Sequence, residues 1–152
     1  MTAQRIDHVG ITTSDLDRSL HFYVDVLGLK LLARHAMSEP DLAALLGLHT
    51  VDLDIADLDS GDGRIVELIH YRQPEGTRVS HHSWDSPTTH IAFTVDDMAA
   101  VEERMAQSKV QVISHRKLTI HDPGGPWDGA VCLYLRDPYG TIIELVQRRP
   151  EA

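Results

Sequence analysis

The first half of the chain combines short apolar segments of strand character with one longer amphipathic segment. Residues 6–12 predict a strand, because apolar side chains alternate with small or polar ones and polar residues flank the segment. Apolar residues within 16–27 recur at three- and four-residue steps, which predicts a helix that begins at Ser14 or Asp15 and ends at Gly28. The other segments predict a short helix over 39–47 and strands over 29–34, 50–58 and 64–71.

The second half repeats this order of elements. It predicts a helix over 97–108 and strands over 90–95, 111–114, 131–135 and 141–147. A polar stretch containing Pro74, Gly76 and Pro87 separates the two halves and is typical of a link. We therefore predict an α+β protein with two tandem β-α-β-β-β modules in one domain over 1–152. Module one covers 5–72, the connector 73–88 and module two 89–148.

Each half carries one histidine and one glutamate at matched places. His8 and His90 open the first predicted strand of their halves, and Glu67 and Glu144 lie in the last one. A single histidine at the start of a strand is usually an ordinary core or rim residue, but repetition in two matched units favours a function. If the four strands bring these side chains to one point, two imidazoles and two carboxylates form a nitrogen and oxygen ligand set for a divalent ion.

The chemistry of this ligand set indicates a catalytic ion rather than a structural one. A closed structural zinc site is commonly built with thiolates, which are absent from the set. Four protein ligands leave positions on the ion for water or for oxygen atoms of a substrate. A binding pocket without a metal on the same scaffold remains the alternative.

Composition and charge exclude several other classes of function. The net charge of −9 argues against a nucleic-acid partner, and no apolar run approaches the length of a membrane span. The N-terminal sequence lacks the apolar core of a signal peptide, and Cys132 has no second cysteine with which to pair. We therefore expect a cytoplasmic protein that binds a small molecule. Because each half alone would be marginally stable, we expect the halves to pack on each other or on a second chain, and a homodimer is favoured.

Motifs at both ends of the repeat resemble a known superfamily. They are Asp-His-Val-Gly-Ile at 7–11, Ser-Asp-Leu-Asp at 14–17 and Asp-Pro-Tyr-Gly-Thr-Ile-Ile-Glu-Leu at 137–145. The chain is similar to the vicinal oxygen chelate superfamily over 6–147. This superfamily includes glyoxalase I, methylmalonyl-CoA epimerase, type I extradiol dioxygenases and the fosfomycin and bleomycin resistance proteins. The resemblance implies that the sheets of the two modules form a cupped half-barrel around a metal, with the helices outside.

The resemblance also implies roles for the matched residues. His8, Glu67, His90 and Glu144 match the four glyoxalase-type ligands of a divalent ion, which could be Zn, Ni, Co, Mn or Fe. The implied activity is that of an isomerase or lyase that acts on a small oxygenated metabolite through a metal-stabilised enolate. Glu144 is the first candidate for the catalytic base and Glu67 the second. Two alternatives remain, a non-catalytic drug- or natural-product-binding protein and an extradiol-type dioxygenase that uses His8, His90 and Glu144.

A few other residues are open to two interpretations. The epimerase branch has a further catalytic glutamate in its first module, for which Asp52 and Asp54 are the nearest, shorter counterparts. The loop 121–129 with Trp127 could cover a site or simply connect two strands. The histidines of the first-module strands could line a pocket or face solvent; they are His35, His49 and His70.

Overall fold

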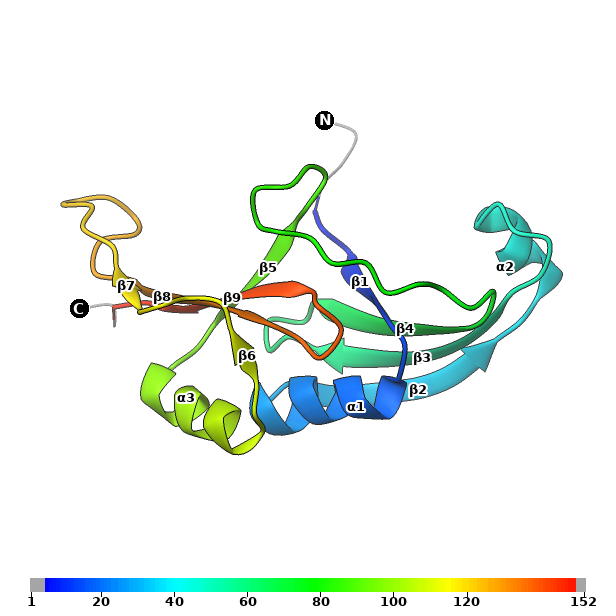
Figure 1. Cartoon of the computed structure of the whole chain (residues 1–152), viewed down its shortest axis with the longest axis horizontal. Coiled ribbons are helices and arrows are strands. Elements are labelled where there is room, and N and C mark those ends of the chain that lie inside the picture. Colours follow the sequence, from blue (N-terminus) through cyan, green and yellow to red (C-terminus); the bar gives the residue numbers. More distant parts are fainter. Residues whose placement is uncertain (1–4, 150–152) are drawn as a thin grey trace. The chain divides into compact units, whose positions relative to one another are not determined.

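The computed structural model describes residues 5–149 and divides the chain into two compact units (Figure 1). The boundary lies between residues 78 and 79, inside the predicted connector. Each unit has its own sheet, so each can be described by itself.

The first unit has the predicted order of strand, helix and three strands. Its strands form one sheet in the order β1-β4-β3-β2, in which β1 is parallel to β4 and the other pairs are antiparallel. The bounds of its elements are β1 (His8–Thr13), α1 (Leu16–Leu20), η1 (His21–Val26), β2 (Lys30–Met37), α2 (Pro40–Leu45), β3 (Asp52–Asp59) and β4 (Ile65–Gln73).

The helix of the first unit starts and stops where the sequence predicts, but its second half is a π-helix. The carboxylate of Asp15 accepts a hydrogen bond from the backbone N–H of Arg18, which caps the first turn. From His21 onward the helix widens, and the N–H of Leu27 donates to the carbonyl five residues earlier, that of Phe22. Gly28 follows with φ of 87°, a conformation that favours glycine and ends the helix. The apolar spacing predicts a helix but does not distinguish an α-turn from a π-turn.

The second unit repeats the architecture with shorter edge strands. Its sheet has the order β5-β9-β8-β6, and the short strand β7 pairs with another part of β8. The bounds are β5 (His90–Thr94), α3 (Met98–Gln107), β6 (Gln111–Val112), β7 (Leu118–Thr119), β8 (Val131–Arg136) and β9 (Ile142–Gln147). The predicted α+β class and the two β-α-β-β-β modules are confirmed, whereas β7 was not predicted.

In each sheet one face packs against the main helix of its unit. In the first unit Leu58 and Leu68 are fully buried on that face, and the hydroxyl groups of Thr13 and Ser19 lie 2.6 Å apart where α1 meets β1. In the second unit Met98, Val101 and Met105 form the buried side of α3, as their spacing predicts, and the carboxylate of Asp97 caps the helix. Because side chains alternate along a strand, the residues between these core positions face the other side of the sheet.

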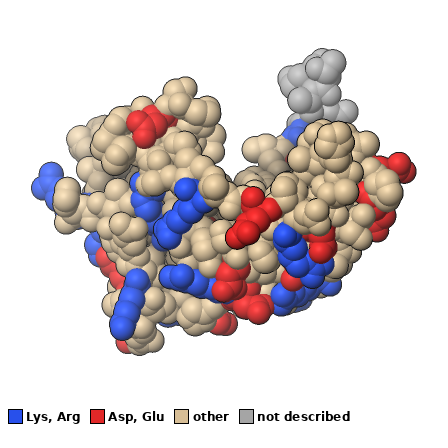
Figure 2. Space-filling model, turned by 45° about the vertical axis from the view of Figure 1, so that its right-hand side comes forward, with Lys and Arg blue, Asp and Glu red and all other residues tan. Residues whose placement is uncertain are grey.

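The charged residues are distributed as pairs rather than as one large acidic field. Arg34 on β2 contacts Asp17 at 2.6 Å and Asp54 at 2.9 Å, and Arg72 contacts Asp52 at 2.7 Å. Figure 2 shows acidic and basic side chains next to one another on the face that it draws. Within 5–149 the longest helix has ten residues, and no helix meets the length and apolarity needed to cross a bilayer.

Candidate functional site

The second unit brings its histidine and glutamate into contact. His90 is the first residue of β5 and Glu144 lies on the neighbouring parallel strand β9, opposite Ala92. Because His90 and Ala92 are two residues apart on one strand, all three side chains lie on the same face of the sheet. His90 Nε2 is 3.2 Å from Glu144 Oε2, so two donor atoms of the predicted ligand set face the same small region.

A tyrosine completes this cluster. Tyr134 lies on β8 directly opposite Glu144, and its hydroxyl group donates to Glu144 Oε2 at 3.1 Å. The same hydroxyl oxygen is 3.2 Å from His90 Nε2. Burial, followed by the negative charge of Glu144, raises the pKa of Tyr134 to about 12. The phenol therefore stays protonated at neutral pH and holds the carboxylate in place.

Glu144 is the more enclosed partner of the pair. Its side chain is 14% exposed, whereas that of His90 is 45% exposed. Cys132 precedes Tyr134 by two residues on the same face and is buried, and both burial and its hydrogen bond with Glu144 raise the pKa of its thiol. The thiol is therefore not a ready nucleophile, and Cys132 is a buried small side chain of the sheet.

The first unit places His8 and Glu67 on one face of a sheet without joining them. Glu67 on β4 pairs with Gly10 of β1, two residues from His8, and a methyl group on Gly10 would lie 3.8 Å from Glu67 Oε2. The His8 ring instead contacts Asp7 at 3.1 Å and is 51% exposed. The hydrogen bond with Asp7 raises the pKa of His8, with smaller contributions from the carboxylates of Glu67 and Asp57. The ring of His8 thus stays half exposed and is held by its neighbour Asp7 rather than by Glu67.

Within each unit, one imidazole and one carboxylate thus lie on the same face of that unit's own sheet. Over residues 5–149 the structure holds no group of three or more histidine, cysteine or acidic side chains arranged to bind a metal. The four-ligand set of His8, Glu67, His90 and Glu144 therefore stays a prediction. The chemistry of each pair, one neutral nitrogen and one carboxylate oxygen, fits a divalent transition metal ion.

Comparison with known proteins assigns the family. The sequence profile of the Glyoxalase/Bleomycin resistance protein/Dioxygenase superfamily matches residues 5–145. The chain belongs to this superfamily. The predicted resemblance is therefore confirmed, since this superfamily and the vicinal oxygen chelate superfamily are the same group.

Individual relatives include two kinds of enzyme. A 2-epi-5-epi-valiolone epimerase from Actinomyces sp is 32% identical over 148 residues, which are 95% of this chain and 79% of that protein. A probable lactoylglutathione lyase from Vibrio cholerae serotype O1 is 26% identical over 151 residues, which are 98% of this chain and 94% of that protein. A crystal structure of a glyoxalase family protein from Bacillus cereus has a TM-score of 0.78 at 20% identity, covering 97% of this chain and 95% of that one. This last likeness supports the fold alone.

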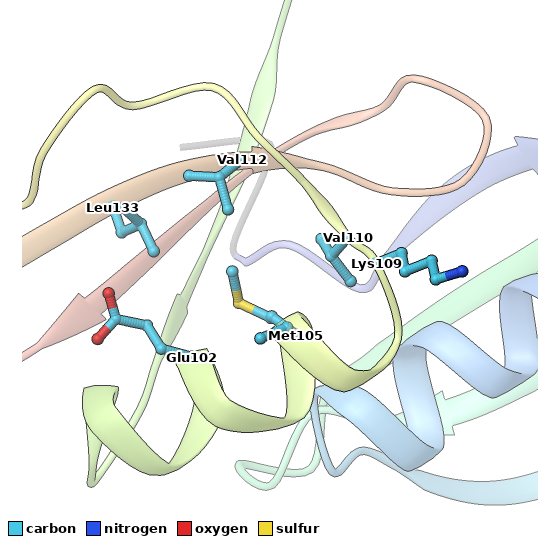
Figure 3. A pocket seen from close by; sticks show the side chains of 7 residues that line it. Glu102, Met105, Lys109, Val110, Val112 and Leu133 are labelled. Carbon is cyan, nitrogen blue, oxygen red and sulfur yellow. The ribbon is translucent and has the colours of Figure 1, made fainter.

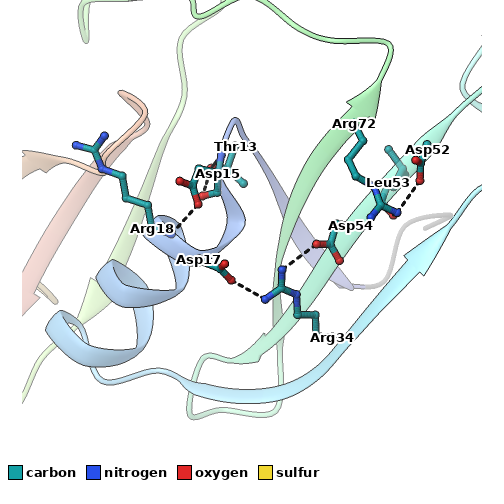
Figure 4. A network of polar contacts seen from close by, with 9 residues as sticks. All are labelled: Thr13, Asp15, Asp17, Arg18, Arg34, Asp52, Leu53, Asp54 and Arg72. Carbon is teal, nitrogen blue, oxygen red and sulfur yellow. Dashed lines mark hydrogen bonds and ion pairs between the residues drawn. The ribbon is translucent and has the colours of Figure 1, made fainter.

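Two acidic residues of the glyoxalase-superfamily chain are excluded from the site by the strand register. Asp52 and Asp54 lie on the face of the first sheet opposite to that of Glu67, since Asp54 pairs with His70 while Asp57 pairs with Glu67. Figure 4 shows Asp54 bound to Arg34 and Asp52 to Arg72. The hydrogen bond with Arg34 lowers the pKa of Asp54. Neither residue can act as the additional base of the epimerase branch.

Sequence reasoning missed Tyr134 and Asp57, which occupy equivalent places. Tyr134 lies ten residues before Glu144 and Asp57 lies ten residues before Glu67, and each is opposite its glutamate in an antiparallel pair. The spacing of ten residues before each glutamate is present in the sequence and points to both Tyr134 and Asp57. Only the register in which the strands pair shows what this spacing means.

The pocket of the second unit lies on the other side of its sheet. It has a volume of about 330 Å³ between α3 and the strands β6 and β8 (Figure 3). Leu133 contributes to its wall, and because Leu133 alternates with Tyr134 along β8, the pocket faces away from His90 and Glu144.

The loop over 121–129 closes the hairpin between β7 and β8. The backbone N–H of Ile120 donates to the carbonyl of Ala130, and that of Gly129 donates to the carbonyl of Ile120. The Arg148 guanidinium lies 3.8 Å from the centre of the Trp127 ring. These contacts support the interpretation of the loop as a strand connection.

Proposed function

We propose that the protein is a divalent-metal-dependent isomerase or lyase that acts on a small oxygenated metabolite. The observation that carries the proposal is the cluster of His90, Tyr134 and Glu144, in which a protonated phenol fixes a largely buried carboxylate beside an imidazole. The relatives support it, since one is an epimerase and another a probable lyase. The metal ligands would be His8, Glu67, His90 and Glu144.

The bound ion would supply one kind of chemistry, the polarisation of a substrate carbonyl, which makes the neighbouring C–H group more acidic. The protein supplies the proton transfer. Glu144 takes the proton from the carbon next to the carbonyl and returns it, and Glu67 is the second candidate for this role. Tyr134 keeps Glu144 oriented without competing for the proton, because its own pKa is about 12.

The predicted homodimer and the cytoplasmic location remain parts of this proposal. Large apolar side chains stay exposed in both units, with Leu45 at 82% and Trp84 at 79%. Such side chains are common at contacts between chains. Analytical ultracentrifugation of the purified protein tests the dimer directly.

The metal content and the proton transfer can be measured independently. Elemental analysis of protein purified without added metal should find a stoichiometric ion. Proton NMR in deuterated solvent should then show exchange of the α-proton of 2-hydroxycyclohexanone, a simple α-hydroxyketone. Glu144→Gln should slow this exchange at least about 100-fold, because general base catalysis contributes on this order. Glu103→Gln on α3 is the matched control and should exchange normally.

The other outcomes discriminate between the alternatives. Retained exchange in Glu144→Gln together with loss in Glu67→Gln transfers the role of base to Glu67. Iron with oxygen uptake indicates ring cleavage by a dioxygenase. A protein that retains no ion and catalyses no exchange indicates a non-catalytic binding protein.

A further inference from the structure

Asp57 places another carboxylate directly opposite Glu67 on the same sheet face. The two residues are directly opposite in the antiparallel pair of β3 and β4, so their side chains project from the same face. The Asp57 side chain is 26% exposed and stands between the fully buried Ala56 and Leu58, which face the helix side of the sheet. Its position is therefore fixed by the strand, while its oxygens remain accessible.

The surroundings of Asp57 differ from those of Asp52 and Asp54 on the same strand. Asp52 and Asp54 each contact an arginine, at 2.7 and 2.9 Å. Within residues 5–149 Asp57 contacts no arginine or lysine, and the Nδ1 atom of the His35 ring is 3.8 Å from Asp57 Oδ2, too far for a hydrogen bond. The Asp57 carboxylate thus keeps unused acceptor positions on the face of the proposed site.

The equivalent residue in the second unit makes the contrast clear. Tyr134 occupies the same register position and donates a hydrogen bond to Glu144. Asp57 cannot do the same for Glu67, because a carboxylate accepts hydrogen bonds and does not donate them, whereas a phenol can donate. The carboxylate of Asp57 can therefore accept hydrogen bonds from a bound group that has donors of its own.

The location of Asp57 fits contact with substrate rather than with the ion. The strand order β1-β4-β3 puts Asp57 one strand farther from His8 than Glu67 is. Farther along the same face, Ile55 and Ile69 pack with Ala43 of α2 and close the surface with apolar side chains. A ligand beside Glu67 thus has a carboxylate along one edge and a limited apolar surface beyond it.

We propose that Asp57, flanked by His35, binds the hydroxyl groups of a compact polyhydroxylated hydroxyketone in the active site. A carboxylate accepts hydrogen bonds at both oxygens, and hydroxyl groups on neighbouring carbons are matched donors. This inference rests on the proposed function, since it names the substrate class of that site. The carbonyl with its adjacent hydroxyl group would also occur in substrates of related enzymes. Asp57 recognises the additional hydroxyl groups.

Two cyclic ketones of matched size separate this role from all others. 2-Keto-myo-inositol and 2-hydroxycyclohexanone share an α-hydroxyketone, and only the first has further ring hydroxyls. Isothermal titration of the Zn²⁺-loaded protein should give about tenfold tighter binding of 2-keto-myo-inositol, the effect expected for one charged hydrogen bond. Asp57→Ala should remove this preference and leave the affinity for 2-hydroxycyclohexanone unchanged. Asp52→Ala, on the opposite face of the same strand, is the control and should keep the preference.

The possible failures are distinguishable. Protein that retains no Zn²⁺ contradicts the proposed function. Zn²⁺-loaded protein that binds 2-hydroxycyclohexanone but shows no preference for the polyhydroxylated ketone contradicts the role of Asp57 alone. An equal loss of both affinities in Asp57→Ala also overturns it, since that result indicates a general effect on the site. Zn²⁺-loaded protein that binds neither ketone contradicts the substrate class.

Discussion

The two units present the same backbone arrangement with different side chains at one matched row. In the second unit the row reads Ala92, Glu144 and Tyr134, and the tyrosine is hydrogen-bonded to the glutamate. The matching row of the first unit reads Gly10, Glu67 and Asp57. The glutamate of the second unit is thus held by a neutral donor, whereas the glutamate of the first unit lies opposite another carboxylate.

The two glutamates are therefore held to different degrees in the protein without ligand. A glutamate held by Tyr134 and His90 keeps its geometry without ligand, which suits a residue that must meet an ion or a proton at a fixed distance. The first unit has no such bond, and His8 contacts its neighbour Asp7 instead. Its row has no side chain at Gly10 and a carboxylate at Asp57.

The largest expected effect tests whether the two units are equally well packed. Leu68 and Leu145 each follow the glutamate of their row and are fully buried. Replacing either by alanine should lower the free energy of unfolding by about 3 kcal/mol, because the cavity adds to the lost burial. Urea denaturation followed by circular dichroism measures this value. Leu118→Ala, at a 59% exposed position, should cost little, and a large difference between the two core variants would show that one unit is packed more loosely.

A smaller effect concerns the contrast between Tyr134 and Asp57. Tyr134→Phe removes the hydroxyl that contacts both Glu144 and His90, so the Zn²⁺ affinity should fall about tenfold. Asp57→Asn should change this affinity less, because Asp57 makes no hydrogen bond to Glu67 within the described residues. Competition with a chromophoric chelator measures both affinities. Equal losses in the two variants would mean that the two positions support the ion alike.

The anchors of the main helices differ in a similar way, by charge. Arg34 holds Asp17 beside α1 to Asp54 of the sheet, whereas Gln147 Oε1 accepts a neutral hydrogen bond from the N–H of Met98 at the start of α3. Arg34→Ala should cost about 1 kcal/mol at low salt and less at high salt. Gln147→Ala should cost about 1 kcal/mol at any ionic strength. Thermal denaturation at several salt concentrations compares them.

The same pair of variants should differ in their response to acid. The pKa of Asp54 is lower in the folded protein than its ordinary value of 3.8, because Arg34 stabilises the carboxylate. Its contribution to stability is therefore complete above pH 3.8 and is lost as the pH falls through the lower folded pKa. The difference between wild type and Arg34→Ala should shrink on acidification into this range. The difference between wild type and Gln147→Ala should stay constant on acidification. If the effect of Arg34→Ala were also independent of pH, the ionic anchor would be contradicted.

Sequence reasoning reached the strands and the four candidate ligands because both depend on local repetition. His8 and His90 stand at the same place in two similar segments, and a period of two identifies their strands. The pairing register between strands is a property of the folded sheet, so the positions of Asp54 and Asp57 on opposite faces were not evident. The partnership of Tyr134 with Glu144 was missed for the same reason.

Local geometry explains the other differences. Phe22, Tyr23 and Val26 are all buried in the π-helix over His21–Val26. The spacing of these apolar residues fits an α-helix equally well. Strands of two residues, such as Leu118–Thr119, are too short to produce a period. The pocket beside α3 was not indicated by any residue pattern, because its lining comes from segments that meet only in the folded unit.

The smallest expected effect concerns the first residue of each row, where Gly10 matches Ala92. A methyl group on Gly10 would lie 3.3 Å from Ile69 Cδ1 and 3.8 Å from Glu67 Oε2, so only the flexible end of Ile69 must shift. The loss of chain freedom in the unfolded state offsets this contact, and Gly10→Ala should change stability by less than about 0.5 kcal/mol. Ala92→Gly should lower stability by about 0.5–1 kcal/mol, because glycine weakens a strand.

Metal affinity then separates packing from function at this position. If Gly10 only matches Ala92 in the repeat, Gly10→Ala should retain wild-type affinity for Zn²⁺ and lose at most some affinity for the larger ketone. Gly10→Val would place a branched side chain beside Glu67 Oε2 and should weaken both. A marked loss of Zn²⁺ affinity in Gly10→Ala, at unchanged thermal stability, would show that Glu67 must move toward the space above Gly10 to bind the ion. In that case the first unit is organised by the ion itself, and the second by Tyr134 beforehand.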